Sequence, residues 1–252
     1  MIDLPNDLRV NNYSLILPSV AVGNVGQLSI DLLISSLELK RIGRVFDPVF
    51  IPLVGINPYN QNSDDICTAV DVYVSHEKKL VVLQIRSPIV QRPTNFFQQI
   101  LTFVTDHNIN RVIILTSSFG HEKRDEQLRT APFRYLATNT ISAEFCNFFN
   151  DLSWIALEPK IVDGFSGQSE IRINGGGFAK LLFDMLQNNK IPCLILLKFC
   201  SEGDNVPDAV ELVNYLNQWL KLLSVNSRNE CILKYPPSWK FLFGNSAPRG
   251  IY

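Results

Sequence analysis

The chain has 252 residues, of which 46% are hydrophobic and 19% are charged, and its formal net charge is −1. This composition predicts a folded globular protein with a sizeable core and excludes a disordered chain. A near-neutral chain without a basic stripe is also not expected to bind nucleic acid, because phosphate contacts need clustered Lys and Arg side chains.

Regular structure is expected to begin with a βα unit at residues 14–39. An apolar run of strand composition comes first, followed by the turn Gly23-Asn24-Val25-Gly26 and then by apolar residues at helical spacing. Free backbone N–H groups at such a helix N-terminus can bind an anion. Here Asn24 and Gln27 can satisfy the first N–H groups, so the favoured interpretation is a self-capped junction without a ligand.

The first half continues with short strands and one helix. Two β-rich runs separated by residues 76–79 predict a hairpin, and apolar spacing predicts a helix at 95–107 with Asn95 as its N-cap. The unbroken apolar run at 112–116 indicates a strand buried on both faces, as in a parallel sheet. The other strands are expected at 42–46, 49–54, 69–75 and 80–86.

The second half alternates strands with helices. Strands are expected at 133–137, 154–157 and 192–199, and helices at 145–152, from the glycines at 175–177 to about residue 188, and at 206–223. Asn205 is expected to cap the last helix, with Pro207 and Asp208 in its first turn. The alternation predicts a single α/β domain with a mostly parallel central sheet flanked by helices. This domain is expected to span residues 1–244, followed by a C-terminal tail at 245–252.

The helix at 206–223 carries two apolar stripes, which together cover more than half of its circumference. That width exceeds the ~100° that a surface helix needs to dock on one core. Either another element of this chain covers the second stripe, or a partner protein does, since an exposed Tyr/Trp/Leu stripe suits the centre of an interface. The candidate partner-binding residues of this stripe are Leu212, Tyr215, Trp219 and Leu222.

Three turns are expected at the carboxyl ends of parallel strands, at 23–26, 117–121 and 201–205. Ligands of open α/β sheets bind at that edge, so an alternative function is that of a nucleoside- or phosphate-binding enzyme. The polar side chains of these turns that could contact such a ligand are Asn24, Ser117, Ser118, His121, Glu202, Asp204 and Asn205. Neither GxGxxG nor GxxxxGK[ST] occurs, and the triplet at 175–177 equally suits a tight turn, so a structural role is favoured for each glycine turn.

No pattern in the sequence pairs a nucleophile with its base. There is no GxSxG elbow and no HExxH motif. The loop HEKRDE at 121–126 could form a carboxylate-rich metal site, but its Lys123 and Arg124 favour a solvated, charge-compensated loop. We therefore expect no catalytic residue, no cofactor and no metal.

The cysteines and the N-terminus favour an intracellular location. The five cysteines are odd in number and show no CxxC spacing, which is typical of reduced thiols in a cytosolic protein: Cys67, Cys146, Cys193, Cys200 and Cys231. The first 13 residues lack a basic region followed by an apolar core, so no secretory signal is expected. No apolar run approaches the ~20 residues that span a bilayer, so no membrane insertion is expected either.

Several separate blocks of the sequence resemble the proteasome assembly chaperone family. The blocks are SVAVGNVGQLSIDLLIS (19–35), PLVGINPY (52–59), LQIRS (83–87), LRTAPFRYLAT (128–138), IRINGGG (171–177), LLKFCSEGDNVPDAVELVNYLNQWL (196–220) and PPSWKFLFG (236–244). Each block is short, and their joint order over most of the chain is what makes the resemblance specific.

The resemblance implies a non-enzymatic chaperone that forms a heterodimer with proteasome assembly chaperone 1. Such a heterodimer binds the α-subunits of the 20S proteasome, promotes assembly of the α-ring and prevents its off-pathway dimerisation. The implied fold is similar to nucleoside-phosphorylase-like domains without their reaction. The implied location is the cytoplasm and the nucleus.

The C-terminal tail supplies the last candidate residues. Related chaperone subunits insert a tail with a hydrophobic residue, a tyrosine and any third residue into pockets between α-subunits. Ile251 and Tyr252 match the hydrophobic and tyrosine positions, and no residue follows Tyr252. A polar tail that ends in two apolar residues suits insertion into another protein, so both are candidate partner-binding residues.

Overall fold

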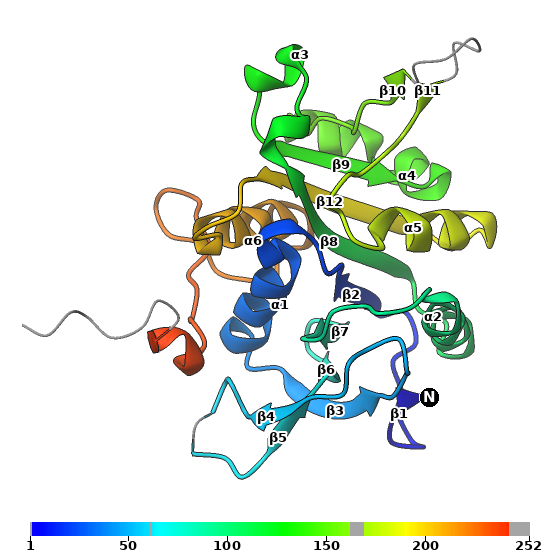
Figure 1. Cartoon of the computed structure of the whole chain (residues 1–252), viewed down its shortest axis with the longest axis vertical. Helices are drawn as coiled ribbons and strands as arrows, with labels where there is room; N and C mark the ends of the chain where they lie inside the picture. The colour runs from blue at the N-terminus through cyan, green and yellow to red at the C-terminus, as the bar shows by residue number, and fades with distance from the viewer. Residues whose placement is uncertain (1, 61, 162–168, 242–252) are drawn as a thin grey trace, which may run out of the picture.

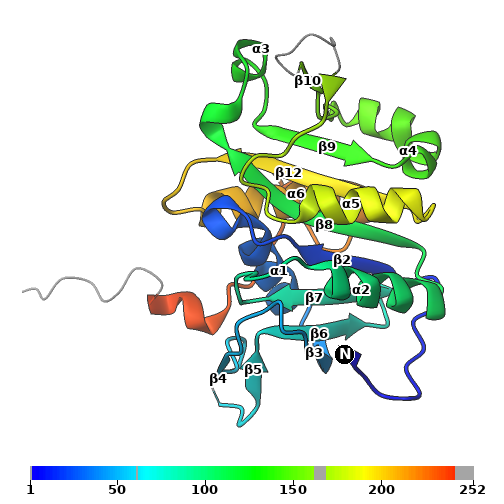
Figure 2. The same cartoon turned by 45° about the vertical axis from the view of Figure 1, so that its right-hand side comes forward.

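The computed structural model describes residues 2–60, 62–161 and 169–241, and an eight-stranded sheet runs through the molecule (Figure 2). Its strands are β1 (Ile2–Asp3), β2 (Ser14–Pro18), β3 (Lys40–Val45), β6 (Val70–Ser75), β7 (Leu80–Ile85), β8 (Arg111–Phe119), β9 (Phe133–Ala137) and β12 (Cys193–Cys200). From edge to edge their order is β1-β3-β6-β7-β2-β8-β12-β9. The four central strands β7, β2, β8 and β12 are parallel, and the strands outside them pair antiparallel.

Helices cover both faces of this sheet (Figure 1). The helices α1 (Val25–Ser36) and α6 (Val206–Leu220) lie on one face, and α2 (Thr94–Asp106) and α5 (Ala179–Asn188) lie on the other. The helix α4 (Asn139–Asp151) packs beside α6, through contacts between its aromatic rings and those of α6. The prediction of a single α/β domain around a central sheet is confirmed, with parallel pairing concentrated at the middle of the sheet. None of the helices that the structure describes is long and apolar enough to cross a bilayer.

The remaining elements are short. Two antiparallel ribbons lie apart from the main sheet, one formed by β4 (Val54–Ile56) with β5 (Ile66–Thr68) and one by β10 (Lys160–Ile161) with β11 (Ser169–Glu170). The short helices are α3 (Asp125–Leu128) and the 3₁₀ turns η1 (Val22–Asn24), η2 (Gly120–Glu122) and η3 (Pro237–Phe241).

Alternating side chains of the central strands build two separate cores. In β2, Leu15 and Leu17 pack with α2 and α5, whereas Ile16 between them packs with α1 and α6. Because both faces are covered, all side chains of β7 and β12 are buried. This double burial explains why the central strands are unbroken apolar runs in the sequence.

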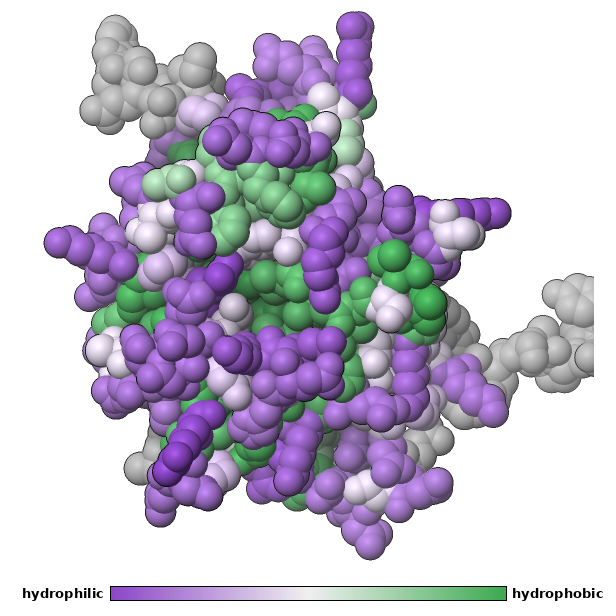
Figure 3. Space-filling model, turned by 180° about the vertical axis from the view of Figure 1, so that it is seen from behind, coloured by the Kyte–Doolittle hydropathy of each residue, from purple (hydrophilic) through white to green (hydrophobic). Residues whose placement is uncertain are grey.

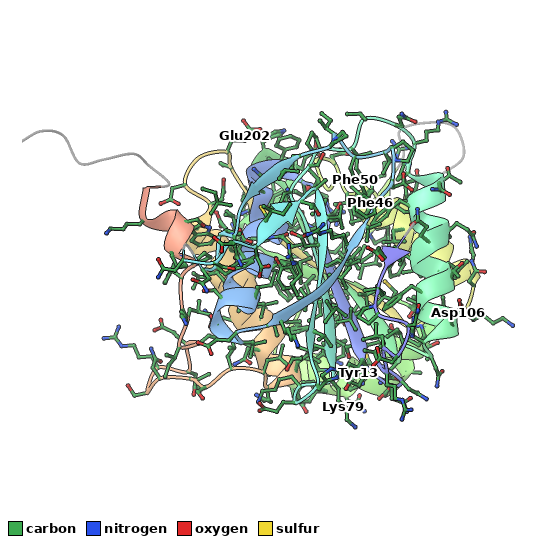
Figure 4. All side chains as sticks on the ribbon, turned by 90° about the horizontal axis from the view of Figure 1, so that it is seen from below. Tyr13, Phe46, Phe50, Lys79, Asp106 and Glu202 are labelled. Atoms are coloured by element: carbon green, nitrogen blue, oxygen red, sulfur yellow. The ribbon has the colours of Figure 1, made fainter. Side chains whose placement is uncertain are left out.

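The parallel strands end together at one edge of the sheet. Glu202, which follows β12, lies at this carboxyl edge, and Tyr13 and Lys79, which precede β2 and β7, lie at the opposite edge (Figure 4). The turns at 23–26 and 201–205 therefore meet at the carboxyl edge, as predicted. The turn predicted at 117–121 begins only at Gly120, because residues 117–119 are still part of β8.

Some strand predictions were wrong in extent. The segment 49–54 is not a strand: β4 begins at Val54, and Phe50 forms a single bridge to Ile89. Likewise, 154–157 contributes one bridge, from Ala156 to Tyr135. By contrast, β8 continues to Phe119 because β12 pairs with it in register as far as Cys200. A strand extends as far as a neighbour pairs with it, which local composition does not determine.

The predicted side-chain caps were also wrong. Asn24 precedes α1 with a left-handed backbone, φ +52°, instead of the extended one of a capping residue, and makes no capping hydrogen bond. Asn95 lies inside α2, where its amide donates to Asp47. Asn205 does precede α6, with Pro207 and Asp208 in the first turn as predicted, but its side chain does not cap the helix.

Candidate functional site

The turns at 23–26 and 201–205 and the end of β8 contact one another directly at the carboxyl edge. The Ser117 hydroxyl donates to the Val22 carbonyl, and the Cys200 thiol lies 3.7 Å from the same oxygen. A Cβ atom on Gly23 would lie 2.5 Å from Oδ1 of Asn205, so no side chain fits between these two turns. Turns that pack this closely fill the space that a ligand would need.

The loop before α5 covers the rest of this edge. The hydroxyls of Ser19 and Thr116 both donate to the Gly176 carbonyl, at 2.8 and 3.0 Å, and the Ser118 hydroxyl donates to the Asn174 carbonyl at 2.7 Å. The Ser19 hydroxyl in turn accepts from the backbone N–H of Phe178 at 2.9 Å. These hydroxyls are therefore engaged by backbone groups of the same chain.

Two glycines of the triplet permit this close approach. Gly177 has φ +59°, and a Cβ atom there would lie 2.1 Å from the Val20 carbonyl oxygen. Gly175 has φ +77° and lies against the ring of Phe119. Only glycine combines the left-handed backbone with such close contacts, so the triplet serves loop packing, as the structural interpretation predicted.

The buried charged group next to this edge, Lys198, is paired within the chain. Lys198 of β12 is buried, and its ammonium group contacts Glu211 and lies 3.6 Å from Asp208, both on α6. The Asn205 amide donates to Asp208 at 3.0 Å. Burial, and next to it the charge of Asp208, raises the pKa of Cys200 to about 11, which keeps this thiol protonated at neutral pH.

The loop after β8 is held by packing as well. The ring of His121 stacks on Phe119, with 5.0 Å between ring centroids. Across the residues that the structure describes, no three His, Cys, Asp or Glu side chains are grouped so that they could hold a metal ion. The metal site considered for residues 121–126 is thus not assembled there.

The second apolar stripe of α6 is covered by this chain itself. Leu212, Trp219 and Leu222 are buried, and Tyr215 stacks on Phe133 with 3.8 Å between ring centroids. The expectation that these four residues form an exposed partner-binding stripe is corrected: of the two alternatives, coverage by another element of the chain is the one observed.

Aromatic rings of α4 close over that stripe. Trp219 meets Phe145 and Phe149 edge-on, at 5.2 and 5.6 Å between centroids. The guanidinium of Arg111 lies 5.2 Å from the rings of both Phe145 and Trp219, a cation–π distance. The sequence pattern predicts the apolar residues at 145–152 but gives no sign of their contact with α6. The other candidates, Ile251 and Tyr252, lie outside the described residues and stay a prediction.

A buried polar network that no sequence pattern predicted joins α1 to the segment after β4. Asp31 accepts hydrogen bonds from Tyr59, Gln84 and Arg86, at 2.5, 2.5 and 3.3 Å, and Arg86 also donates to the Tyr59 hydroxyl at 2.8 Å. Burial, then the neighbouring Asp31, raises the pKa of Tyr59 well above its ordinary value, so the phenol is neutral and donates. All four residues lie in the sequence blocks that carry the resemblance: Asp31 in 19–35, Tyr59 in 52–59, and Gln84 and Arg86 in 83–87. Polar residues inside these blocks are the signal that could have identified the network.

A groove of about 680 Å³ opens next to this network. Its lining is mostly polar and charged and includes Tyr59, Tyr73, Glu38, Lys40, Arg41, Asp65 and Lys234. Several of these charges are already paired, since Lys234 contacts Glu38 at 2.7 Å and Arg41 contacts Asp65 at 3.4 Å. Most of the charge around the groove is therefore compensated by these two ion pairs.

Apolar side chains are exposed around the β4–β5 ribbon. We call this the β4–β5 surface and define it by Phe46, Ile51, Pro52, Leu53, Val54, Ile56, Ile66 and Val90. Val54 and Ile56 are the most exposed, at 70% and 75%. On the face seen from behind, apolar residues lie in separate areas divided by hydrophilic side chains (Figure 3). Exposed apolar residues that gather in one place mark an interaction site, so the β4–β5 surface is the candidate functional site of a binding protein.

Comparison with known proteins agrees with the sequence resemblance. A family model described as the PAC2 family matches residues 15–229. A curated relative from Mus musculus, named Proteasome assembly chaperone 2, is 40% identical over 253 residues, which cover 96% of this chain and 96% of the relative. The protein of the same name from Homo sapiens is 39% identical, and 95% of each chain is covered.

The fold is also found among solved structures. PbaA from Pyrococcus furiosus, described as an archaeal homolog of proteasome-assembly chaperone, superposes with a TM-score of 0.64. The superposition covers 91% of this chain and 89% of PbaA at 20% sequence identity. At that identity the similarity establishes the fold.

Proposed function

The chain belongs to the PAC2 family, and from this premise we propose that it is a proteasome assembly chaperone. The observation that carries the proposal is the match to relatives named Proteasome assembly chaperone 2, at close to 40% identity over nearly the whole of both chains. Identity at this level over the full length supports a shared function as well as a shared fold.

We propose further that the chain acts as one half of a heterodimer with proteasome assembly chaperone 1. The heterodimer binds α-subunits of the 20S proteasome, promotes assembly of the α-ring and prevents off-pathway dimerisation of α-rings, in the cytoplasm and the nucleus. The exposed apolar β4–β5 surface supports a role in which a protein partner is bound.

The proposal is that of a binding protein and not of an enzyme. In its support, the hydroxyls at the carboxyl edge donate to backbone carbonyls, and the buried Lys198 is paired with carboxylates of α6. A thermal-shift screen with nucleosides, nucleotides and phosphate tests the enzyme alternative, because a ligand of the native state raises the melting temperature. We expect no shift, and a saturable increase with any of these compounds would favour the alternative.

Co-expression with proteasome assembly chaperone 1 is the direct test of the heterodimer. We expect a 1:1 complex in native mass spectrometry, and capture of 20S α-subunits by the purified complex in a pull-down. The matched control is this chain expressed by itself, which should capture fewer α-subunits. An exclusively monomeric chain in the co-expression sample would contradict the proposal.

The tail residues Ile251 and Tyr252 belong to the same proposal. Deletion of residues 250–252 is expected to weaken binding to α-rings and to leave the heterodimer intact, because the tail is proposed to enter a pocket of the ring. The two effects are separated by measuring α-ring binding and native mass in the same preparation. Unchanged affinity for α-rings would show that the tail does not contribute to α-ring binding.

A further inference from the structure

We infer that the groove between α1 and the β4–β5 ribbon is a binding site for an extended polypeptide segment without a large net charge. This site goes beyond the proposed function and does not depend on it. Four observations carry it: two buried hydroxyls without partners, the size of the groove, backbone contacts that its walls already make, and the balance of its charges. The ribbon, α1 and η3 lie on the same side of the molecule in both views (Figures 1 and 2).

Two buried hydroxyl groups line this groove without a hydrogen-bond partner. Ser35 of α1 and Tyr73 of β6 both belong to its lining, and each residue is only 4% exposed. Across the described residues, neither hydroxyl makes a hydrogen bond, and neither oxygen is sealed from solvent, so both open into the groove. Buried polar groups are normally hydrogen-bonded, so two unpartnered hydroxyls in one groove indicate a ligand that supplies their partners.

The groove has the size of a ligand site. Its volume of about 680 Å³ falls within the roughly 300–1,000 Å³ of ordinary ligand pockets and far exceeds the space of a single ion. Its lining also contains apolar side chains, among them Ile34, Leu39 and Pro237. A ligand that fills the groove therefore combines hydrogen-bonding groups with at least one apolar group.

Side chains around the groove already bind polypeptide backbone. The Ser36 hydroxyl, next to the unpartnered Ser35, accepts a hydrogen bond from the backbone N–H of Lys234 at 2.9 Å. On the opposite wall, the guanidinium of Arg41 donates to the carbonyl of Ile66. A hydroxyl can both donate and accept, so the two unpartnered hydroxyls can bind the C=O and N–H groups of a second extended segment in the same way.

The charges at the groove favour a polypeptide over a polyanion such as a nucleotide. The Lys234–Glu38 and Arg41–Asp65 pairs place both signs on its walls. Glu38, Asp65 and Lys234 are mostly exposed in these pairs, and exposed ion pairs contribute little to stability. They can therefore exchange with acidic and basic side chains of a bound segment, whereas a polyanion would meet Glu38 and Asp65 with the wrong sign.

Tyr73 is held ready to donate a hydrogen bond. Its strand β6 pairs with β3 so that Tyr73 lies opposite Arg41, and its ring meets that of Tyr59 edge-on at 5.7 Å. Tyr59 is in turn fixed by Asp31 and Arg86. Burial raises the pKa of Tyr73, so the phenol keeps its proton at neutral pH and can donate to a peptide carbonyl. A donor that is ordered before binding loses little conformational entropy when the ligand arrives.

The double variant Ser35→Ala/Tyr73→Phe tests the inference, because it removes only the two hydroxyl groups. Peptides are selected from a phage-displayed library of short random sequences on the immobilised wild-type chain, with the double variant as the counter-selection. The selected peptides are expected to bind the wild-type chain in fluorescence anisotropy and to bind the double variant at least tenfold more weakly, since two hydrogen bonds are lost. The matched control is Tyr215→Phe on α6, which removes a hydroxyl away from the groove and should bind like the wild-type chain.

The melting temperature separates a binding role from a structural one. Neither hydroxyl has a partner in the described part of the chain, so the double variant should melt at the wild-type temperature. A lower melting temperature would assign the hydroxyls to the support of the fold and overturn the inference.

A measurement on the unaltered chain locates the bound peptide. Addition of a selected peptide is expected to shift the amide resonances of residues 35–41 and 66–73 in NMR spectra and to leave those of α6 in place. No enrichment on the wild-type chain over the double variant, equal affinities for the two chains, or shifts confined to other surfaces would each contradict a peptide site in the groove. These outcomes are independent of the heterodimer, which co-expression tests by itself.

Discussion

The apolar stripe of α6 and the β4–β5 surface have similar apolar compositions in the sequence, but the first is buried in the structure and the second is exposed. Both are rich in large apolar residues with few charges between them. The rings of α4 and β9 cover Tyr215 and Trp219 on α6, whereas Val54 and Ile56 stay exposed. An apolar pattern thus indicates that something will cover it, and only the neighbouring elements decide whether that is the same chain or a partner.

The largest contrast between the two regions is expected from paired truncations. Trp219→Ala removes a buried ring from contacts with Phe145 and Phe149 and should lower the free energy of unfolding by about 4 kcal/mol. Ile56→Ala, at a side chain that is 75% exposed, should change it by less than about 0.5 kcal/mol. Urea unfolding of the purified chain measures both. Equal losses for the two variants would mean that the monomer buries the ribbon too.

The second comparison concerns the buried network of Asp31, Tyr59, Gln84 and Arg86, which joins α1 to the segment after β4. Arg86→Met leaves the carboxylate of Asp31, which is 15% exposed, without its cation, and should cost about 3 kcal/mol of folding stability. Arg92→Met, at an exposed position, is the matched control and should be nearly neutral. The melting temperatures of the two variants give the comparison. A neutral Arg86→Met would show that the network does not hold residues 57–60 against α1.

A smaller, pH-dependent effect is expected beside the covered region, at Glu158. Burial opposes ionisation of this carboxyl, but hydrogen bonds from Arg134 at 3.0 Å and from Gln127 outweigh it, so the pKa of Glu158 is lowered. The unfolded chain then binds this proton more readily, and the contribution to stability is present above the ordinary Glu pKa of about 4.3 and lost as the pH falls through the folded-state value.

The variant Glu158→Gln removes that titration. Its stability should fall less steeply than that of the wild-type chain between about pH 5 and pH 3, by less than about 1 kcal/mol over the range. Glu126→Gln, at an exposed residue of α3, serves as control and should keep the wild-type slope. Identical slopes for Glu158→Gln and wild type, from urea unfolding at each pH, would exclude a contribution from the Arg134 contact.

The smallest effect is chemical and leaves stability unchanged. Cys146 on α4 is exposed and should react quickly with a thiol reagent such as dithionitrobenzoate. Burial raises the pKa of Cys193 and of Cys200, the latter to about 11, so both should react only after unfolding. Cys146→Ser is expected to abolish the fast phase. A fast phase that persists in this variant would show that a second thiol, the half-buried Cys231 or one of the buried ones, is accessible.

Much of the fold could be read from local pattern, and the errors share one cause. The hairpin of β6 and β7, the buried strand β12 and the helix α6 are where the residues predict them, because each is a long run with a clear period or a clear turn. The segments 49–54 and 154–157 were predicted as strands because they are apolar. In the structure each forms only a single bridge, so neither becomes a strand. Asp31, Tyr59 and the pair Gln84 and Arg86 are separated by tens of positions in the sequence and become neighbours only in the folded chain.

By itself, the sequence determined the α/β class, the positions of most helices and strands and, through the order of its blocks, the family. Those features depend on local periodicity and on residue identity, which a linear chain displays in full. Only the tertiary structure decided that the glycine turns close on backbone carbonyls, that α4 covers α6 and that Val54 and Ile56 stay exposed. Burial is a property of what packs on a residue from elsewhere in the chain, and no local pattern contains that information.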